Sequence, residues 1–246
     1  MRRSAKQFFI SLILLAIVCA VVFLAYFFFF SPAPPLCEDC DTKDLEKLKL
    51  ELLTPVKTGD NRYDLVARIR NPNQTNGAKK IEYSFKIYGG DDMNPIEEVV
   101  GTSYILANQA KYIIEPNVEV PASPASGAAS PGNIKIKFSV SQVEWRKMEG
   151  DIPVFALFHP AYSSLKNEQG GFASFTGTLV NKTSSLYKLV RVVVVLFDSN
   201  NSIISTNLAN VENVSPNKDY DFNIIWSEPF LGIMARYDVE AYANPF

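Results

Sequence analysis

The chain has 246 residues, in which 24 Lys and Arg balance 26 Asp and Glu, and it contains one His and three Cys. The formal net charge of −2 argues against nucleic acid or an anionic surface as a partner, because such partners require a basic face that displaces counterions. One histidine and three cysteines also leave few residues for a metal or catalytic centre.

Residues 8–30 form an apolar run without charge, Gly or Pro. As a helix this run spans roughly 34 Å, which covers the core of a bilayer. Basic residues precede it and acidic residues follow it, so residues 1–7 are predicted to stay in the cytoplasm. A cleaved signal peptide is the alternative, but the run exceeds a signal core and ends in 27–30, four Phe without a small-x-small site. We therefore predict an uncleaved single-pass anchor in the cell membrane, with residues 31–246 extracytoplasmic.

Residues 31–45 are predicted to form an extended spacer, because they open with three prolines in five positions. Cys37 and Cys40 lie in this spacer and are interpreted as a local or intermolecular disulfide. A redox pair, half of a metal site and free thiols are the alternatives. Acidic residues between the two thiols disfavour thiolate formation, and only Cys19 and His159 remain as further metal ligands.

From residue 46 onward the pattern is that of β-structure. Apolar and polar residues alternate over 63–69, 81–87 and 134–140, and turn sequences such as Asn71-Pro72-Asn73 separate these segments. The same alternation predicts a strand at 48–52, and shorter apolar segments are expected to be strands at 99–106 and 111–120. We therefore predict a first antiparallel β-sandwich over residues 46–148.

The pattern restarts in a predicted second sandwich over residues 149–246. Its strands are expected at 172–180, 189–197, 203–208, 221–226 and 237–242. Asn71-Pro72-Asn73 aligns with Asn181-Lys182-Thr183 at an offset of 110, and 85–89 aligns with 194–198 at an offset of 109. Such ordered markers predict a duplicated module. The expected fold class is all-β, with two tandem sandwiches after one transmembrane helix.

These markers resemble motifs of known families. The segment 66–73, which ends in Asn-Pro-Asn, resembles the hallmark of late-embryogenesis-abundant type 2 and water-stress (WHy) domains. The segment 194–198, Val-Val-Leu-Phe-Asp, resembles the Phe-x-Leu-Tyr-Asp signature of FxLYD domains, and 85–88 is a second match with Gly89 in place of the Asp. The whole chain is similar to signal-anchored proteins of candidate-phylum (Patescibacteria-type) bacteria that carry two such modules. The resemblance implies immunoglobulin-like or fibronectin-III-like sandwiches, and it carries over no catalytic residue.

The sequence contains no phosphate-binding glycine loop, nucleophile elbow or metalloprotease motif. We therefore predict a protein that is not an enzyme, with no cofactor, no metal and no evident small-molecule substrate. His159 is interpreted as a surface or capping residue, and Trp145 and Trp226 as core or inter-module packing. Four Asn-x-Ser/Thr sequons are interpreted as chance matches from turn composition, and they begin at Asn73, Asn181, Asn200 and Asn213.

Binding is expected at the end loops, where sandwich modules usually present their contact residues. A weak Ca²⁺ site at 91–94 is disfavoured against a solvated loop, because an oxygen cage needs six to eight ligands. The candidate interaction residues are Asp91, Asp92, Asn94, Pro124, Pro131, Asn200 and Asn201.

The expected function is that of a membrane-anchored extracytoplasmic structural or binding module that contacts other envelope proteins. An accessory subunit of a cell-envelope secretion or pilus machine is the first alternative. An envelope redox protein that uses Cys37 and Cys40 is the second.

Overall fold

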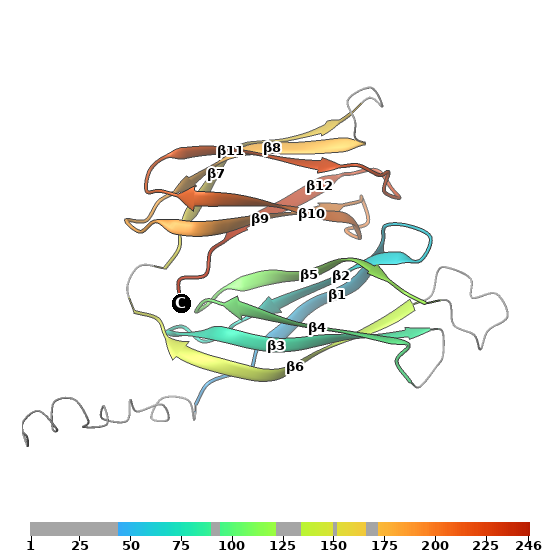
Figure 1. The fold of residues 1–246 in the computed structure, drawn as a ribbon, viewed down its shortest axis with the longest axis horizontal. Coiled ribbons are helices and arrows are strands. Elements are labelled where there is room, and N and C mark those ends of the chain that lie inside the picture. Colours follow the sequence, from blue (N-terminus) through green and yellow to red (C-terminus); the bar gives the residue numbers. More distant parts are fainter. Residues whose placement is uncertain (1–43, 90–93, 122–133, 150–151, 166–171) are drawn as a thin grey trace, which may run out of the picture. The chain divides into compact units, whose positions relative to one another are not determined.

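The computed structural model describes residues 44–89, 94–121, 134–149, 152–165 and 172–246 (Figure 1). This part of the chain holds twelve β-strands and no α-helix, and Leu45–Phe246 form one compact unit. No helix long and apolar enough to cross a bilayer occurs within the described ranges. The predicted anchor at residues 8–30 lies outside them.

The first six strands form two three-stranded antiparallel sheets, ordered β1-β2-β5 and β4-β3-β6. Their bounds are β1 Lys49–Lys57, β2 Arg62–Arg70, β3 Asn76–Gly89, β4 Glu97–Ile105, β5 Ala110–Glu119 and β6 Ile134–Lys147. These strands are called the N-terminal half below.

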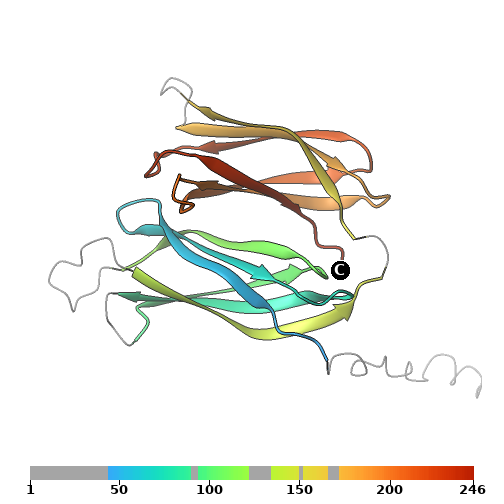
Figure 2. The same ribbon diagram turned by 180° about the vertical axis from the view of Figure 1, so that it is seen from behind.

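The last six strands, called the C-terminal half, repeat this pairing with the orders β7-β8-β11 and β10-β9-β12, seen from behind in Figure 2. Their bounds are β7 Phe155–Ser164, β8 Ala173–Asn181, β9 Tyr187–Phe197, β10 Ile203–Val214, β11 Asp219–Trp226 and β12 Arg236–Tyr242. The prediction of an all-β, sandwich-like chain is confirmed. The predicted boundary between residues 148 and 149 stays a prediction.

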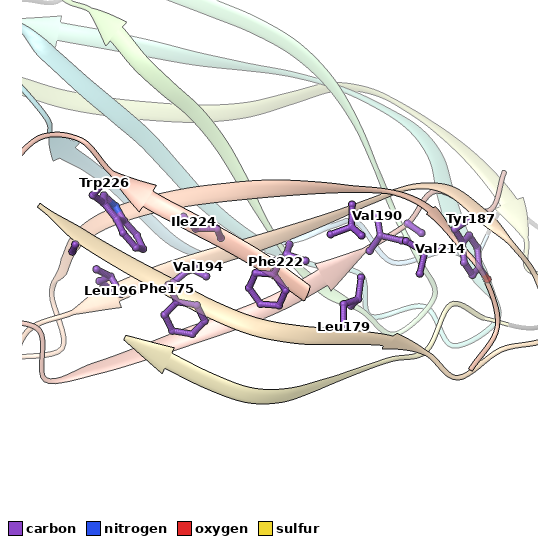
Figure 3. Packing of buried hydrophobic residues seen from close by; sticks show 14 of the residues in the cluster. Phe175, Leu179, Tyr187, Val190, Val194, Leu196, Val214, Phe222, Ile224 and Trp226 are labelled. Atoms are coloured by element: carbon purple, nitrogen blue, oxygen red, sulfur yellow. The ribbon is translucent and has the colours of Figure 1, made fainter. Parts of the chain in front are cut away.

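Each half buries a hydrophobic core of its own, built from alternate residues of its strands. In the N-terminal half, Leu65 and Ile69 of β2 pack with Phe85 of β3, and all three are at most 1% exposed. Figure 3 shows the C-terminal core, where Phe175 of β8 and Trp226 at the end of β11 lie in one cluster. Trp226 is buried and Trp145 packs half-buried against the N-terminal core, as the sequence predicts for both.

The strand β7 is not predicted by the sequence, which shows no clear alternation between residues 148 and 172. It lies at the edge of its sheet and is mostly exposed, so only one neighbour constrains its residues. His159 has a φ of 50° and its pairing with β8 shifts register between Phe158 and Ala161. Pro160, which has no N–H to donate, is tolerated at such an edge bulge. His159 is therefore an exposed residue inside β7 and not part of a connection.

Asn71 and Asn181 close equivalent turns at the ends of β2 and β8, and both are fully buried. Each side-chain oxygen accepts a hydrogen bond from the backbone N–H two residues on, at 3.1 Å from Asn73 and 2.9 Å from Thr183. Each side-chain nitrogen donates to two backbone carbonyls, those of Asn76 and Leu106 for Asn71, and those of Ser185 and Val214 for Asn181. The Asn-Pro-Asn sequence is therefore a structural turn, with a counterpart in the C-terminal half.

Candidate functional site at the junction of the two halves

The central strands β2 and β9 bury residues on both of their faces. In β9, Val194 and Leu196 belong to the C-terminal core, whereas Val193 and Val195 turn toward the N-terminal half. A third apolar cluster results, and its buried members are Val56, Val66, Tyr112, Val193, Val195, Phe197 and Tyr242. The two halves are therefore joined by packed side chains as well as by the chain itself.

Buried polar contacts accompany this cluster. The Thr206 hydroxyl donates to Asp64 Oδ2 at 2.7 Å, and the Asn117 N–H donates to Asp64 Oδ1 at 2.9 Å. Burial raises the pKa of the Asp64 carboxyl, and these two hydrogen bonds oppose the rise. Two further pairs join the halves: Tyr112 Oη donates to Asp238 Oδ2 at 3.0 Å, and Arg68 Nη2 donates to Glu240 Oε1 at 3.0 Å.

Lys111 of β5 is a buried cation beside this junction, with 7% of its surface exposed. Its Nζ donates to the Tyr104 carbonyl at 2.9 Å and lies 3.3 Å from the centre of the Tyr104 ring. Within the described ranges no carboxylate forms an ion pair with it. Burial, together with the positive charge of Arg191, lowers the pKa of Lys111 to about 7. An ammonium has three N–H donors, and the Tyr104 carbonyl occupies one.

A cleft of about 730 Å³ lies next to Lys111 and is lined by both halves. Its charged lining residues are three cations and one carboxylate, namely Lys111, Lys188, Arg191 and Glu149. Its aromatic lining residues are Tyr83, Tyr104 and Tyr112 from the N-terminal half, and Tyr187 and Tyr242 from the C-terminal half. The cleft thus combines tyrosines, aliphatic side chains and polar groups with an excess of positive charge, in a chain whose net charge is negative.

Some polar groups of the cleft are engaged within the protein. The Tyr83 hydroxyl donates to Glu115 at 2.6 Å, and the Tyr242 hydroxyl donates to Glu240. Burial raises the pKa of Tyr83 and of Tyr104, so both hydroxyls stay protonated at neutral pH. The charged groups of the lining that can meet a ligand are therefore mainly the cations.

The predicted disulfide pair and most of the predicted interaction residues lie outside the described ranges. Those outside are Cys37, Cys40, Asp91, Asp92, Pro124 and Pro131. Asn94 is exposed. Asn200 and Asn201 are exposed in a tight turn that Asp198 organises, since its Oδ1 accepts the backbone N–H of Asn200 and Ser202 at 2.9 and 2.8 Å. Arg236 Nε also donates to Asn201 Oδ1 at 2.7 Å. Asn94, Asn200 and Asn201, the three that the structure describes, do not line the cleft.

The cleft residues were not predicted, although two sequence signals point to them. Lys111 opens the segment Lys-Tyr-Ile-Ile, in which a charged residue stands at the start of an apolar strand. The run 189–197 is almost continuously apolar, which is typical of a strand that is buried on both faces. Neither signal shows which residues of the other half pack against the second face of the strand. Among the described residues, no group of three or more His, Cys, Asp or Glu side chains is placed to hold a metal ion.

No protein-family model matches the chain, and no curated protein matches it. Among solved structures, the transglutaminase of red sea bream is similar to this chain at 8% sequence identity and a TM-score of 0.25. The match covers 79% of this chain and 31% of the transglutaminase chain. At this identity and TM-score the likeness bears on neither activity nor mechanism.

Proposed function

We propose that the chain is a membrane-anchored extracytoplasmic module with a structural or binding role and no enzymatic activity. Residues 8–30 form the anchor, and residues 46–148 and 149–246 form two immunoglobulin-like or fibronectin-III-like sandwiches. Its partners are other envelope proteins. The resemblance to tandem FxLYD and late-embryogenesis-abundant type 2 domains, in signal-anchored bacterial proteins, supports this assignment of modules.

The observation that carries the proposal is the packed junction between the two halves. A flexible tether needs only a linker, whereas this chain buries apolar side chains such as Val66 and Val195 and pairs Asp64 with Thr206 across the junction. Such contacts hold two modules in one relative orientation, because exposing them to water is unfavourable. A fixed pair of modules suits a scaffold that presents surfaces at a defined place outside the membrane.

The test is crosslinking in intact cells with the full-length protein in its membrane. A photoreactive residue replaces Asn94 or Asn200, which are exposed in loops, or Glu212, which is exposed in β10 and serves as a matched control. Links from the loop positions alone, to one or a few envelope proteins, are the expected result. Recovery of the protein without detergent, from a salt wash of the membranes, would contradict the anchor.

The same experiment separates the proposed role from the first alternative. Links to every core component of one secretion or pilus machine, with stoichiometric co-purification in mild detergent, identify an accessory subunit. Links to the cell wall or to other copies of this chain identify a free-standing surface module.

The redox alternative needs its own test. The double substitution Cys37→Ser, Cys40→Ser is expected to leave folding, crosslinks and thiol exchange of the envelope unchanged. A loss of thiol-exchange activity in this variant would replace the proposed function with a redox one.

A further inference from the structure

The cleft at the junction has the size and lining of a ligand site. Its volume of about 730 Å³ falls in the range of small-molecule sites, and its lining combines tyrosines and aliphatic side chains with polar residues such as Ser103 and Ser185 and a few charged groups. A single inorganic ion would fill only a small part of this volume and would make no contact with the apolar lining residues. The lining therefore favours a ligand with a charged group on an apolar or aromatic body.

The charge that the ligand must carry follows from the cations. The Lys111 ammonium is buried against Tyr104, has donors left over after its one hydrogen bond, and has no carboxylate partner within the described ranges. Arg191 of β9 lines the same cleft and acts on Lys111 as a like charge. Two cations that face one space repel each other, and an anion placed between them removes that repulsion.

We propose that this cleft binds an organic carboxylate with an apolar or aromatic body, and that the Lys111 ammonium and the Arg191 guanidinium hold the carboxylate. A carboxylate accepts hydrogen bonds from both groups at once. A free organic acid and the C-terminal residue of a polypeptide present the same chemistry. This inference goes beyond the proposed scaffold role, since it adds a ligand to the junction that fixes the two halves.

Proton uptake accompanies binding. The pKa of Lys111 in the free protein is about 7, so at pH 8.5 its amine is largely neutral. A bound carboxylate favours the charged form of the amine, and the complex takes up a proton. The other titratable and aromatic groups that line the cleft with Lys111 are Tyr83 of β3, Tyr104 of β4, Tyr112 of β5, Tyr187, Lys188 and Arg191 of β9, Tyr242 of β12, and Glu149.

The test uses the full chain in detergent micelles and isothermal titration calorimetry at pH 6.5. The probes are 3-phenylpropionate and a short peptide that ends in a free Phe carboxylate. Their neutral controls are 3-phenylpropionamide and the same peptide with a C-terminal amide. We expect an acid to bind and its amide not to bind. Lys111→Met should weaken acid binding by about tenfold or more, and Lys218→Gln, at an exposed site outside the cleft, should not change it.

Arg191→Gln tests the same site without touching a buried residue, since Arg191 is exposed, and it should also weaken acid binding. Binding of 3-phenylpropionate assigns the site to free acids, whereas binding of the peptide acid alone assigns it to polypeptide C-termini. At pH 8.5, titrations in two buffers of different ionisation enthalpy should show uptake of about one proton, which is lost in Lys111→Met. Failure of both acids to bind, equal binding of acids and amides, or unchanged binding in both variants would overturn the proposal.

Discussion

At the scale of single residues, Asn71 and Asn181 show how one buried amide holds a turn together. Each has its two N–H donors and its oxygen engaged with the backbone or with a side chain two residues on. Removing such a side chain leaves two buried carbonyls and a buried N–H without partners. The resulting destabilisation should exceed the mean contribution of a single hydrogen bond to stability.

We predict that Asn71→Ala lowers the free energy of unfolding by about 2–4 kcal/mol, because buried backbone groups lose their partners. Urea denaturation followed by tryptophan fluorescence measures this change. Asn210→Ala is the matched control, since Asn210 is exposed in β10, and a change within about 0.5 kcal/mol is expected there. Equal effects of the two substitutions would show that the buried turn amide contributes no more to stability than an exposed one.

Lys111 predicts a pH dependence of stability whose sign follows from its lowered pKa. Between pH 7 and about 10 the unfolded chain holds a proton on this amine and the folded chain does not, so stability rises with pH. The rise is expected to be on the order of 3–5 kcal/mol. Above about pH 10 the trend reverses, because burial raises the pKa of Tyr83, Tyr104 and Tyr112 and the unfolded chain ionises first.

Unfolding free energies measured from pH 6 to 11 check this profile. In Lys111→Met the rise between pH 7 and 10 should disappear while the fall at higher pH remains. A variant that keeps the rise would assign it to other groups.

At the scale of elements, two glycines lie opposite aromatic rings on neighbouring strands. Gly177 of β8 pairs with Phe222 of β11, and Gly101 of β4 pairs with Tyr83 of β3. A Cβ at Gly177 would lie 2.8 Å from Phe222 Cζ, closer than real contacts allow. In each pair the ring covers a position that has no side chain of its own.

We therefore predict that Gly177→Ala destabilises the protein by about 1–3 kcal/mol, because the Phe222 ring must leave its place in the core. Gly59→Ala is the control, since its Cβ would meet Arg62 Cβ at an ordinary 3.5 Å. Thermal denaturation of both variants separates the two cases. A Gly177→Ala protein as stable as the control would show that the ring moves without loss of packing.

The strands also show which parts of the fold the sequence pattern predicts and which it does not. The alternation of apolar and polar residues predicts β2, β3 and β6 correctly. One face of each strand contacts a core, so every second residue is apolar. The edge strand β7 lacks such a pattern and carries a bulge at His159, so alternation does not find it. The cleft is harder still, since Lys111 and Arg191 are brought together by contacts between halves that local periodicity does not encode.

At the scale of the whole molecule, the junction should couple the unfolding of the two halves. Val195 is fully buried in the apolar cluster that both halves share. Val195→Ser removes apolar contacts and buries a hydroxyl there, while the N-terminal core stays intact.

We predict one calorimetric transition for the natural protein and two separate transitions for Val195→Ser. Differential scanning calorimetry measures both. Val100→Ser is the control at an exposed position, where 73% of the valine surface is accessible, and it should keep a single transition. Two transitions in the natural protein would mean that the halves unfold independently despite their contacts.

The buried turn asparagines have a practical consequence for producing this protein. Asn73 and Asn181 begin Asn-x-Thr sequons, yet these residues are only 9% and 0% exposed and their side-chain nitrogens donate inside the fold. A eukaryotic secretory host attaches N-linked sugar to such sequons, and a bulky glycan on Asn181 leaves no room for the turn to close. Recombinant protein should therefore be produced in a host without N-glycosylation, because a glycan on Asn181 would prevent correct folding.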